Sequence, residues 1–221
     1  MTTVTFVTKK CRVCGNISRQ AEMGVRGIME PYDLDSRPTG AARSSIYLWV
    51  QRCSACGYCA PDITQGDEGV QKVVKSQEYR NRLTDQSRPE ALNHFLCWSM
   101  LQEAVGRHNE AGWAMLYAAW ICDDDANIRA HAVECRENAL HLFDKARECG
   151  QDFRKGRLQE ELLKIDLFRR CGRFDEAAAL CSEQLERGCD SRSKQILLFQ
   201  EDLLEAKDSS KHTIAEATED M

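Results

Sequence analysis

Four cysteines near the N-terminus have the spacing of a metal site. Cys11 and Cys14 form one C-x-x-C pair, Cys53 and Cys56 form another, and a glycine follows each pair. Two cysteines separated by two residues can place both sulfurs on one tight turn, and the glycine lets the chain leave that turn with a positive φ. Two such turns, here called the first knuckle (residues 11–15) and the second knuckle (residues 53–57), supply the four thiolates that a tetrahedral zinc ion takes.

The choice of ligands and of metal has alternatives. Cys59 forms a further C-x-x-C with Cys56, but only Cys53 with Cys56 repeats the glycine of the first knuckle, so Cys59 would be a bystander or a spare ligand. Four thiolates suit zinc or iron. We favour zinc, because iron would imply electron transfer, which nothing else in the sequence supports. With no open ligand position, one zinc ion per chain would be structural.

Composition and charge are those of a globular protein of one or two domains. Of 221 residues, 29% are charged and 43% hydrophobic, and the net charge of −5 does not favour general nucleic-acid binding. Residues 1–60 hold eight Lys and Arg against four Asp and Glu, so the N-terminal part is mildly basic. The twelve cysteines come without a signal-peptide pattern and without an apolar run long enough for a membrane span. We expect a cytoplasmic protein with reduced thiols and no membrane association.

The elements that must position the knuckles are expected to be short strands. Residues 3–7 are β-branched and aromatic and predict a strand leading into the first knuckle. Residues 18–42 have few apolar positions and turn signals at Pro38 and Gly40, which predicts a loop-like insert. Residues 45–51 alternate in character and predict a strand leading into the second knuckle. Two hairpins with a knuckle at each tip would form a zinc-ribbon domain over residues 1–62.

After Pro61 the apolar residues recur at helical spacing. They predict helices over residues 67–86, from about 90 to Gly106, over 109–121, from about 125 to 149, up to Gly172, up to Gly188, and over 190–206. Ser87 and Glu90 have the spacing of a capping box, and the glycines that end helices are expected C-caps. This gives a helical domain over residues 63–206 and a flexible acidic tail over residues 207–221.

Two segments of the helical region share the pattern Gly-Arg-x-x-Glu-Ala. They begin at Gly106 and Gly172, each between two predicted helices, 66 residues apart, which is close to twice the tetratricopeptide period of about 34. The halfway point falls on Ala139, inside a predicted helix with no turn signal. We therefore expect antiparallel helical hairpins that resemble tetratricopeptide repeats without forming a regular solenoid. The predicted fold class is α+β, mostly α.

Most large apolar side chains of the helical region are expected in the core. Trp98, Trp113, Trp120 and Phe143 lie at helical spacing, which favours a buried helix face over a binding groove. The cysteines of this region form no second C-x-x-C and are expected to be small buried apolar residues. They are Cys97, Cys122, Cys135, Cys149, Cys171, Cys181 and Cys189.

Taken together, these features resemble a family. The two knuckles, Tyr58 after the second, the step from Asp35 to Pro38, the segment 47–50 and the repeat-like helices are similar to a bacterial and archaeal family of unknown function. That family joins a C-x-x-C-G…C-x-x-C-G-Y zinc ribbon to tetratricopeptide-like helices, and the likeness covers about residues 8–200. It implies metal binding and a helical scaffold but no activity. The chain departs from the pattern at Ser54 and Cys59.

No catalytic motif is visible. The five histidines form no H-E-x-x-H pattern, and there is no G-x-S-x-G elbow or phosphate-binding glycine loop. We expect a non-catalytic adaptor that binds a protein partner through its helices. The first alternative is nucleic-acid binding through the ribbon, and the second is thiol redox through Cys56 and Cys59. The residues expected to contact nucleic acid are Arg12, Arg37, Arg43, Arg52, Tyr47 and Trp49.

Overall fold

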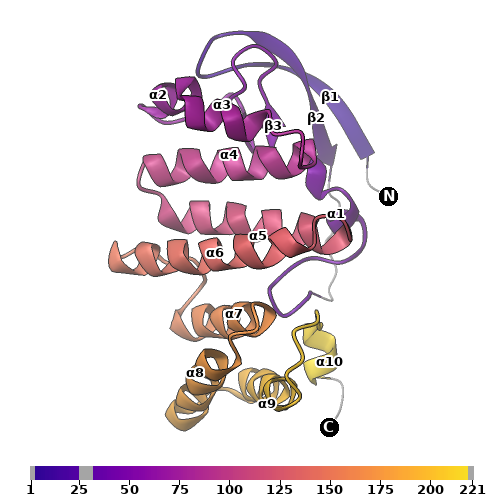
Figure 1. Cartoon of the computed structure of the whole chain (residues 1–221), viewed down its shortest axis with the longest axis vertical. Coiled ribbons are helices and arrows are strands. Elements are labelled where there is room, and N and C mark those ends of the chain that lie inside the picture. The colour runs from indigo at the N-terminus through magenta and orange to yellow at the C-terminus, as the bar shows by residue number, and fades with distance from the viewer. Residues whose placement is uncertain (1–2, 25–31, 219–221) are drawn as a thin grey trace. The chain divides into compact units, whose positions relative to one another are not determined.

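The computed structural model describes residues 3–24 and 32–218 (Figure 1). By spatial contact the chain forms two compact units, the first from Met1–Gly27 with Ala41–Gln151 and the second from Ile28–Gly40 with Asp152–Met221. The protein is mostly helical with two small antiparallel strand pairs, which confirms the α+β, mostly α, class. The predicted domain boundaries at residues 62 and 206 differ from the bounds of these two units, and the division into those domains stays a prediction.

Two β-hairpins carry the knuckles in the first unit. Strands β1 (Thr3–Lys10) and β2 (Ile17–Gly24) pair along their whole length, from Thr3 opposite Gly24 to Lys10 opposite Ile17. Strands β3 (Gln51–Arg52) and β4 (Cys59–Ala60) form the second, shorter hairpin. The predicted strand over residues 3–7 is confirmed. Strand β2 corrects the first part of the expected insert. Half of its eight residues are polar and only one is buried, so the strand shows no apolar pattern although it pairs with β1. Residues 25–31 lie outside the described residues.

The strand predicted over residues 45–51 is wrong. Helix α1 (Gly40–Ser44) precedes this segment, the segment itself contains a 3₁₀ turn, η1 (Ile46–Leu48), and only its last residue, Gln51, joins a strand. The alternation in the sequence reflects one-sided burial of a helical turn, since Ile46 and Val50 are buried and Tyr47 is exposed. The Trp49 ring packs edge-on against Tyr117, with centroids 5.3 Å apart. Packing on the helices therefore outweighs local strand propensity.

The predicted helix over residues 67–86 is divided at Ser76. Helices α2 (Val70–Lys75) and α3 (Gln77–Leu83) flank this residue, whose backbone is extended with φ −67° and ψ 150°. The Ser76 hydroxyl accepts a hydrogen bond from the Tyr79 amide and so caps α3. A serine within a run of helical spacing can be either an exposed residue of one helix or the cap of a second. The spacing of apolar residues alone therefore does not reveal that the helix is interrupted at Ser76.

Three long helices follow in the first unit. Helices α4 (Glu90–Ala104), α5 (His108–Asp124) and α6 (Ala130–Glu148) pack side by side in chain order (Figure 1). The capping box predicted at Ser87 does not form, because the Ser87 hydroxyl donates to Asp85 and Pro89 occupies the N-cap without a side-chain bond. Among the described residues, no helix combines the length and apolar character needed to cross a membrane.

Aromatic rings fill the core between α4, α5 and α6. Trp98, Trp120 and Phe143 are buried as predicted, whereas Trp113 is half-buried. The Tyr117 ring lies among them, with centroids 4.9 Å from Trp120 and 5.7 Å from Trp113. These rings therefore lie mainly in the core, as predicted, and Trp98 in addition lines a cavity of the first unit.

The described residues of the second unit form four helices, α7 (Arg157–Arg170), α8 (Phe174–Arg187), α9 (Ser191–Glu205) and α10 (Ile214–Thr218). Asp190 caps α9 as predicted, accepting from the Ser193 amide at 3.0 Å. A cluster of small and aliphatic side chains forms part of the core of this unit, and the half-buried rings of Phe168 and Phe174 pack against it. The members of the cluster are Leu162, Ile165, Ala177, Cys181, Leu197 and Leu204.

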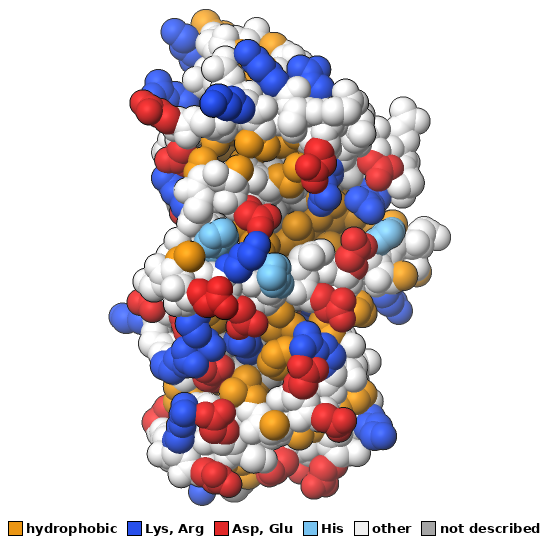
Figure 2. All heavy atoms as spheres, turned by 60° about the vertical axis from the view of Figure 1, so that its left-hand side comes forward, with side chains coloured by type: hydrophobic (Ala, Val, Ile, Leu, Met, Phe, Trp, Pro, Cys, Tyr) orange, Lys and Arg blue, Asp and Glu red, His pale blue; other side chains and the backbone are white. Residues whose placement is uncertain are grey.

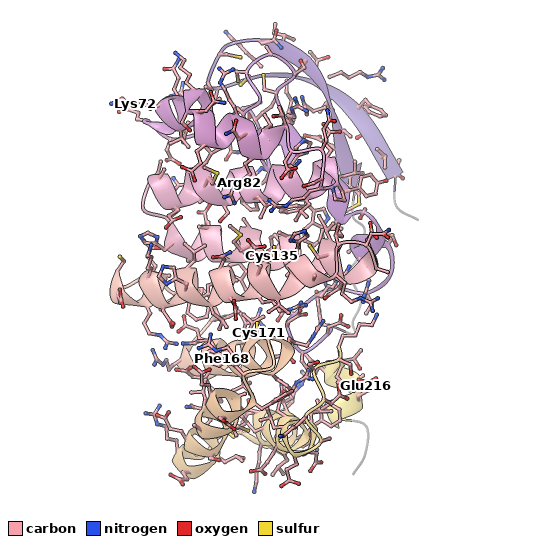
Figure 3. All side chains as sticks on the ribbon, in the orientation of Figure 1. Lys72, Arg82, Cys135, Phe168, Cys171 and Glu216 are labelled. Carbon is pink, nitrogen blue, oxygen red and sulfur yellow. The ribbon has the colours of Figure 1, made fainter. Side chains whose placement is uncertain are left out.

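Part of the expected tail is structured. Residues 32–34 and 212–214 run alongside each other, with Leu34 donating to the His212 carbonyl and Ile214 donating to the Tyr32 carbonyl, both at 2.8 Å. The step from Asp35 to Pro38 follows this pairing; Asp35 and Arg37 are buried, and the Arg37 amide donates to Asp35 Oδ1. Helix α10, which carries Glu216 (Figure 3), lies within the segment expected to be a tail. Residues 219–221 lie outside the described residues, so flexibility there stays a prediction.

The two Gly-Arg-x-x-Glu-Ala segments have the same backbone structure. Gly106 and Gly172 have φ of 77° and 75°, and the amides of Arg107 and Arg173 each donate at 2.9 Å to the carbonyl five residues earlier. This is the Schellman ending of a helix. In the second copy, the Arg173 guanidinium also lies 4.6 Å from the ring of Phe168 on α7 (Figure 3). The helical hairpins are confirmed; the likeness to tetratricopeptide repeats stays an interpretation.

Candidate metal centre

The structure brings the four predicted cysteines together. The Sγ atoms of Cys11, Cys14, Cys53 and Cys56 all lie within 4.8 Å of one another. Cys11 Sγ is 3.8 Å from Cys56 Sγ, and Cys14 Sγ is 3.6 Å from Cys53 Sγ. Sulfurs at tetrahedral corners about 2.3 Å from a zinc ion lie about 3.8 Å apart. The arrangement therefore has the dimensions of a four-thiolate centre that suits zinc or iron.

Both knuckles have the same backbone turn at the tip of a hairpin. Gly15 and Gly57 have φ of 75° and 79°, which an L side chain rarely adopts. Two backbone bonds of 2.8–2.9 Å close each turn: Cys11 N to Asn16 O and Gly15 N to Cys11 O in the first, Cys53 N to Tyr58 O and Gly57 N to Cys53 O in the second. The prediction of one turn used twice is confirmed.

Other contacts hold the two hairpins against each other. The Arg12 amide donates to the Ile63 carbonyl at 2.8 Å, and the Gln20 side chain donates to the Arg52 carbonyl at 3.1 Å. Lys9, on β1, lies 2.6 Å from Glu22 of β2 and 3.0 Å from Asp62. These contacts bring the two sulfur pairs together without a metal–sulfur bond. The geometry of the centre therefore depends on both hairpins.

Burial and backbone donors act in opposite directions on the thiols. Burial raises the pKa of Cys11 and of Cys56 above that of an ordinary thiol. Burial also opposes ionisation of Cys53, but the backbone amides of Cys56 and Ala55, with the neighbouring thiols, outweigh it and lower the pKa of Cys53 to about 7. Ligating cysteines are deprotonated. Four thiolates at this separation repel one another, and a bound cation would supply the positive charge that compensates them.

Cys59 lies outside the cluster. Its side chain is fully buried, and its Sγ donates to the Gly57 carbonyl at 3.4 Å. The Cys59 amide donates to the Tyr79 hydroxyl, which in turn donates to Gly57 O at 2.9 Å. Burial raises the pKa of the Cys59 thiol. This buried thiol favours neither the spare-ligand nor the redox alternative. The role of Tyr79 could not be predicted from the sequence, because a tyrosine at helical spacing cannot be told from an ordinary core residue.

The helical cysteines form no comparable group. Cys97, Cys122, Cys135 (Figure 3) and Cys181 are buried as predicted, but Cys149 is exposed and the prediction for it is wrong. Cys171 and Cys189 are half-buried. Across residues 3–24 and 32–218, the four knuckle cysteines are the one set of histidine, cysteine and acidic side chains with the geometry of a metal site.

Four of the six residues expected to contact nucleic acid are buried, paired with an acid or packed on the core. Arg37 is buried in the second unit. In the first unit, Arg43 is paired with Asp124 at 3.1 Å and Arg52 with Glu90 at 2.7 Å. Trp49 packs on the aromatic core, which leaves only Arg12 and Tyr47 exposed. Figure 2 shows acidic and basic side chains interspersed over the middle and lower parts of the face in view, whereas Lys and Arg predominate at its upper end. The six predicted residues themselves provide no support for this alternative.

Comparison of the chain with protein-family models, curated proteins and solved structures finds no match. The family resemblance consequently rests on the sequence motifs alone. Of what that resemblance implies, the four-cysteine cluster and the mostly helical body are present in the structure.

Proposed function

We propose that this chain is a non-catalytic cytoplasmic scaffold, in which one structural zinc ion fixes the two hairpins beside helices that bind a protein partner. The observation that carries the proposal is the meeting of sulfurs 39 and 45 residues apart in sequence at 3.6 and 3.8 Å. Cys11, Cys14, Cys53 and Cys56 fill all four positions of a tetrahedral ion. No position is left for a substrate or a reactive water, as in structural zinc sites.

The second knuckle is packed directly on the helices. The Tyr79 hydroxyl of α3 donates to Gly57 O at 2.9 Å, and Arg52 of β3 lies 2.7 Å from Glu90 at the start of α4. Metal binding orders the chain around its ligands. Zinc at the knuckles would therefore stabilise the surface formed by the hairpins together with α3 and α4, which is what a scaffold requires.

Exposed apolar side chains on one hairpin support the proposal that the chain binds a protein. Val4, Phe6 and Ile17 are each at least 43% exposed and all lie on the β1–β2 hairpin. Exposed apolar side chains that gather on one element are typical of interaction sites. The hairpin also leaves strand edges that can pair with an extended segment of another chain. These features favour protein binding over turnover of a small molecule.

Elemental analysis and affinity capture on one preparation test this function. The chain purified without added metal should contain one zinc and no iron per molecule, and should retain a specific protein partner from native lysate. Chelated protein provides the matched control and should lose that partner. Stoichiometric iron, a folded metal-free chain, or turnover of a small molecule without protein association would contradict the proposal.

A further inference from the structure

A cavity of about 380 Å³ opens beside the second knuckle, within the first unit. It lies between the loop that follows β4 and the turn that joins α4 to α5, and its volume is in the range of small-ligand sites. Six of the residues that line it are aromatic or charged. They are Tyr58, Asp62, Asp67, Trp98, Arg107 and Glu110.

The charged residues of this cavity can be compared with their equivalents in the second Gly-Arg-x-x-Glu-Ala turn. In the second Gly-Arg-x-x-Glu-Ala turn, Arg173 and Glu176 form a bidentate ion pair, one of whose contacts joins Nε to Oε2 at 2.5 Å. In the first turn, Arg107 instead donates to Asp67 Oδ1 at 2.5 Å and stays 3.7 Å from Glu110. The pair is therefore closed by two hydrogen bonds in the second turn, whereas in the first it is open, with one longer ion contact of 3.7 Å. Glu110 also lines the cavity.

Gln102 connects two residues that line the cavity, Glu110 and Trp98. This residue is buried, and with its amide nitrogen toward Glu110 it lies 3.0 Å from Oε2, while its oxygen accepts from Trp98 Nε1 at 3.2 Å. A neutral amide orients the carboxylate without compensating its charge. Glu110 is thus positioned by Gln102 but lacks the bidentate cation that Glu176 has.

The remaining charges leave the cavity negative. Lys9 lies 3.0 Å from Asp62, and Arg107 is paired with Asp67, so each of these two acids has a cation. Glu110 provides the additional negative charge. Trp98 and Tyr58, which are 9% and 2% exposed, also line this cavity. A carboxylate beside aromatic rings suits an organic cation, since ring faces attract ammonium and guanidinium groups.

We propose that this cavity binds the ammonium or guanidinium group of a lysine or arginine side chain from a protein partner. Glu110 serves as the counter-ion, and the rings of Trp98 and Tyr58 contact the apolar stem. The choice of a protein as the source of the cation rests on the proposed scaffold function. The site lies next to Gly57, so a zinc-ordered knuckle would also order the loop that forms one wall.

Calorimetric titration of the zinc-loaded full-length protein with capped tripeptides tests the proposal. Peptides with a central lysine or arginine should bind, and the peptide with a central glutamine should not. Glu110→Gln should weaken binding about tenfold, corresponding to about 1.4 kcal/mol. Glu176→Gln changes the equivalent residue of the closed turn and should leave affinity unchanged. Equal binding of the neutral peptide, or wild-type affinity in Glu110→Gln, would overturn the proposal.

A variant that is expected to bind the peptide more tightly shows that the loss of binding in Glu110→Gln is not a general loss of structure. Arg107→Gln removes the cation nearest Glu110 and should strengthen binding of the lysine peptide several-fold, whereas Arg173→Gln should not. Free n-butylamine should bind more weakly than the peptide; equal affinity would overturn the assignment to a side chain of a protein. Zinc analysis on the same samples separates the two proposals. A chain with one zinc that binds no cationic peptide contradicts this inference alone.

Discussion

Gly57 of the second knuckle lies against Leu83 of α3 so closely that a Cβ at Gly57 would be 2.5 Å from Leu83 Cδ2. The same glycine has φ of 79°. Two constraints therefore meet at one position, since the turn needs a left-handed backbone and the helix leaves no room for a side chain. The knuckle and α3 are fixed against each other by this contact.

Gly57→Ala should cost more stability than Gly15→Ala. Both glycines have a positive φ, which costs an alanine about 1–2 kcal/mol, but a Cβ at Gly15 meets only Lys10 Cε at 3.8 Å. The clash with Leu83 adds about 1–3 kcal/mol of overpacking at Gly57. Urea denaturation with saturating zinc measures both variants. Equal losses would show that the Leu83 contact does not constrain the knuckle.

Close packing also sets the distance between α5 and α6. A Cβ at Gly112 would lie 2.6 Å from the Phe143 ring, so Gly112→Ala should destabilise the protein by about 1–3 kcal/mol. Phe143→Leu in the same chain should restore part of that loss. A double-mutant cycle by urea denaturation measures the coupling. Strict additivity of the two single changes would contradict direct contact as the cause.

Arg169 anchors the segment after α9 to α7. It is fully buried and donates to Asp166 Oδ1 at 2.6 Å, Gln200 Oε1 at 2.9 Å and the carbonyls of Asp208 and Ser210. Arg169→Met should cost about 3–5 kcal/mol, because it leaves the Asp166 carboxylate buried without this cation. Hydrogen exchange should also accelerate in residues 208–218.

Arg187→Met supplies the matched control for that change. Arg187 pairs with Glu183 on α8, but its side chain is 58% exposed, and exposed pairs contribute at most about 1 kcal/mol. Urea denaturation should therefore barely distinguish this variant from the wild type. A comparable loss in both variants would mean that the Arg169 network has no special role.

Acidification should destabilise the protein through His94. Burial lowers the pKa of His94 below its usual 6.5, with Arg52 acting in the same direction and Glu90 against it. Below about pH 6.5 the unfolded chain then binds a proton that the folded chain does not, so stability falls as pH falls through this range. The urea midpoint should drop more steeply from pH 7.5 to 5.5 in wild type than in His94→Gln. Parallel profiles would contradict this role of His94.

Features encoded by neighbouring residues were predictable from the sequence. The two knuckles follow from C-x-x-C-G spacing, and the helix endings at Gly106 and Gly172 follow from the need for positive φ. The cap at Asp190 is likewise a local interaction. Each of these requires only a few consecutive residues, and each is present in the structure.

Features that depend on distant partners were not predictable in this way. Strand β2 is polar and is a strand because it pairs with β1. Residues 46–48 form a 3₁₀ turn. The next residue, Trp49, packs on Tyr117, which lies 68 positions further along the chain. The contrast between the closed pair at Arg173 and the open one at Arg107 depends on Asp67, which lies far from the shared motif.

Zinc content per chain in cysteine variants tests the central claim most directly. Purified wild type should contain one zinc per chain, and so should Cys59→Ala, because that thiol lies outside the cluster. Cys14→Ser and Cys53→Ser should each lose the metal and the folded structure of residues 1–60, since structural zinc and folding are coupled. One zinc per chain in both serine variants, or its loss in Cys59→Ala alone, would contradict a centre formed by the two knuckles.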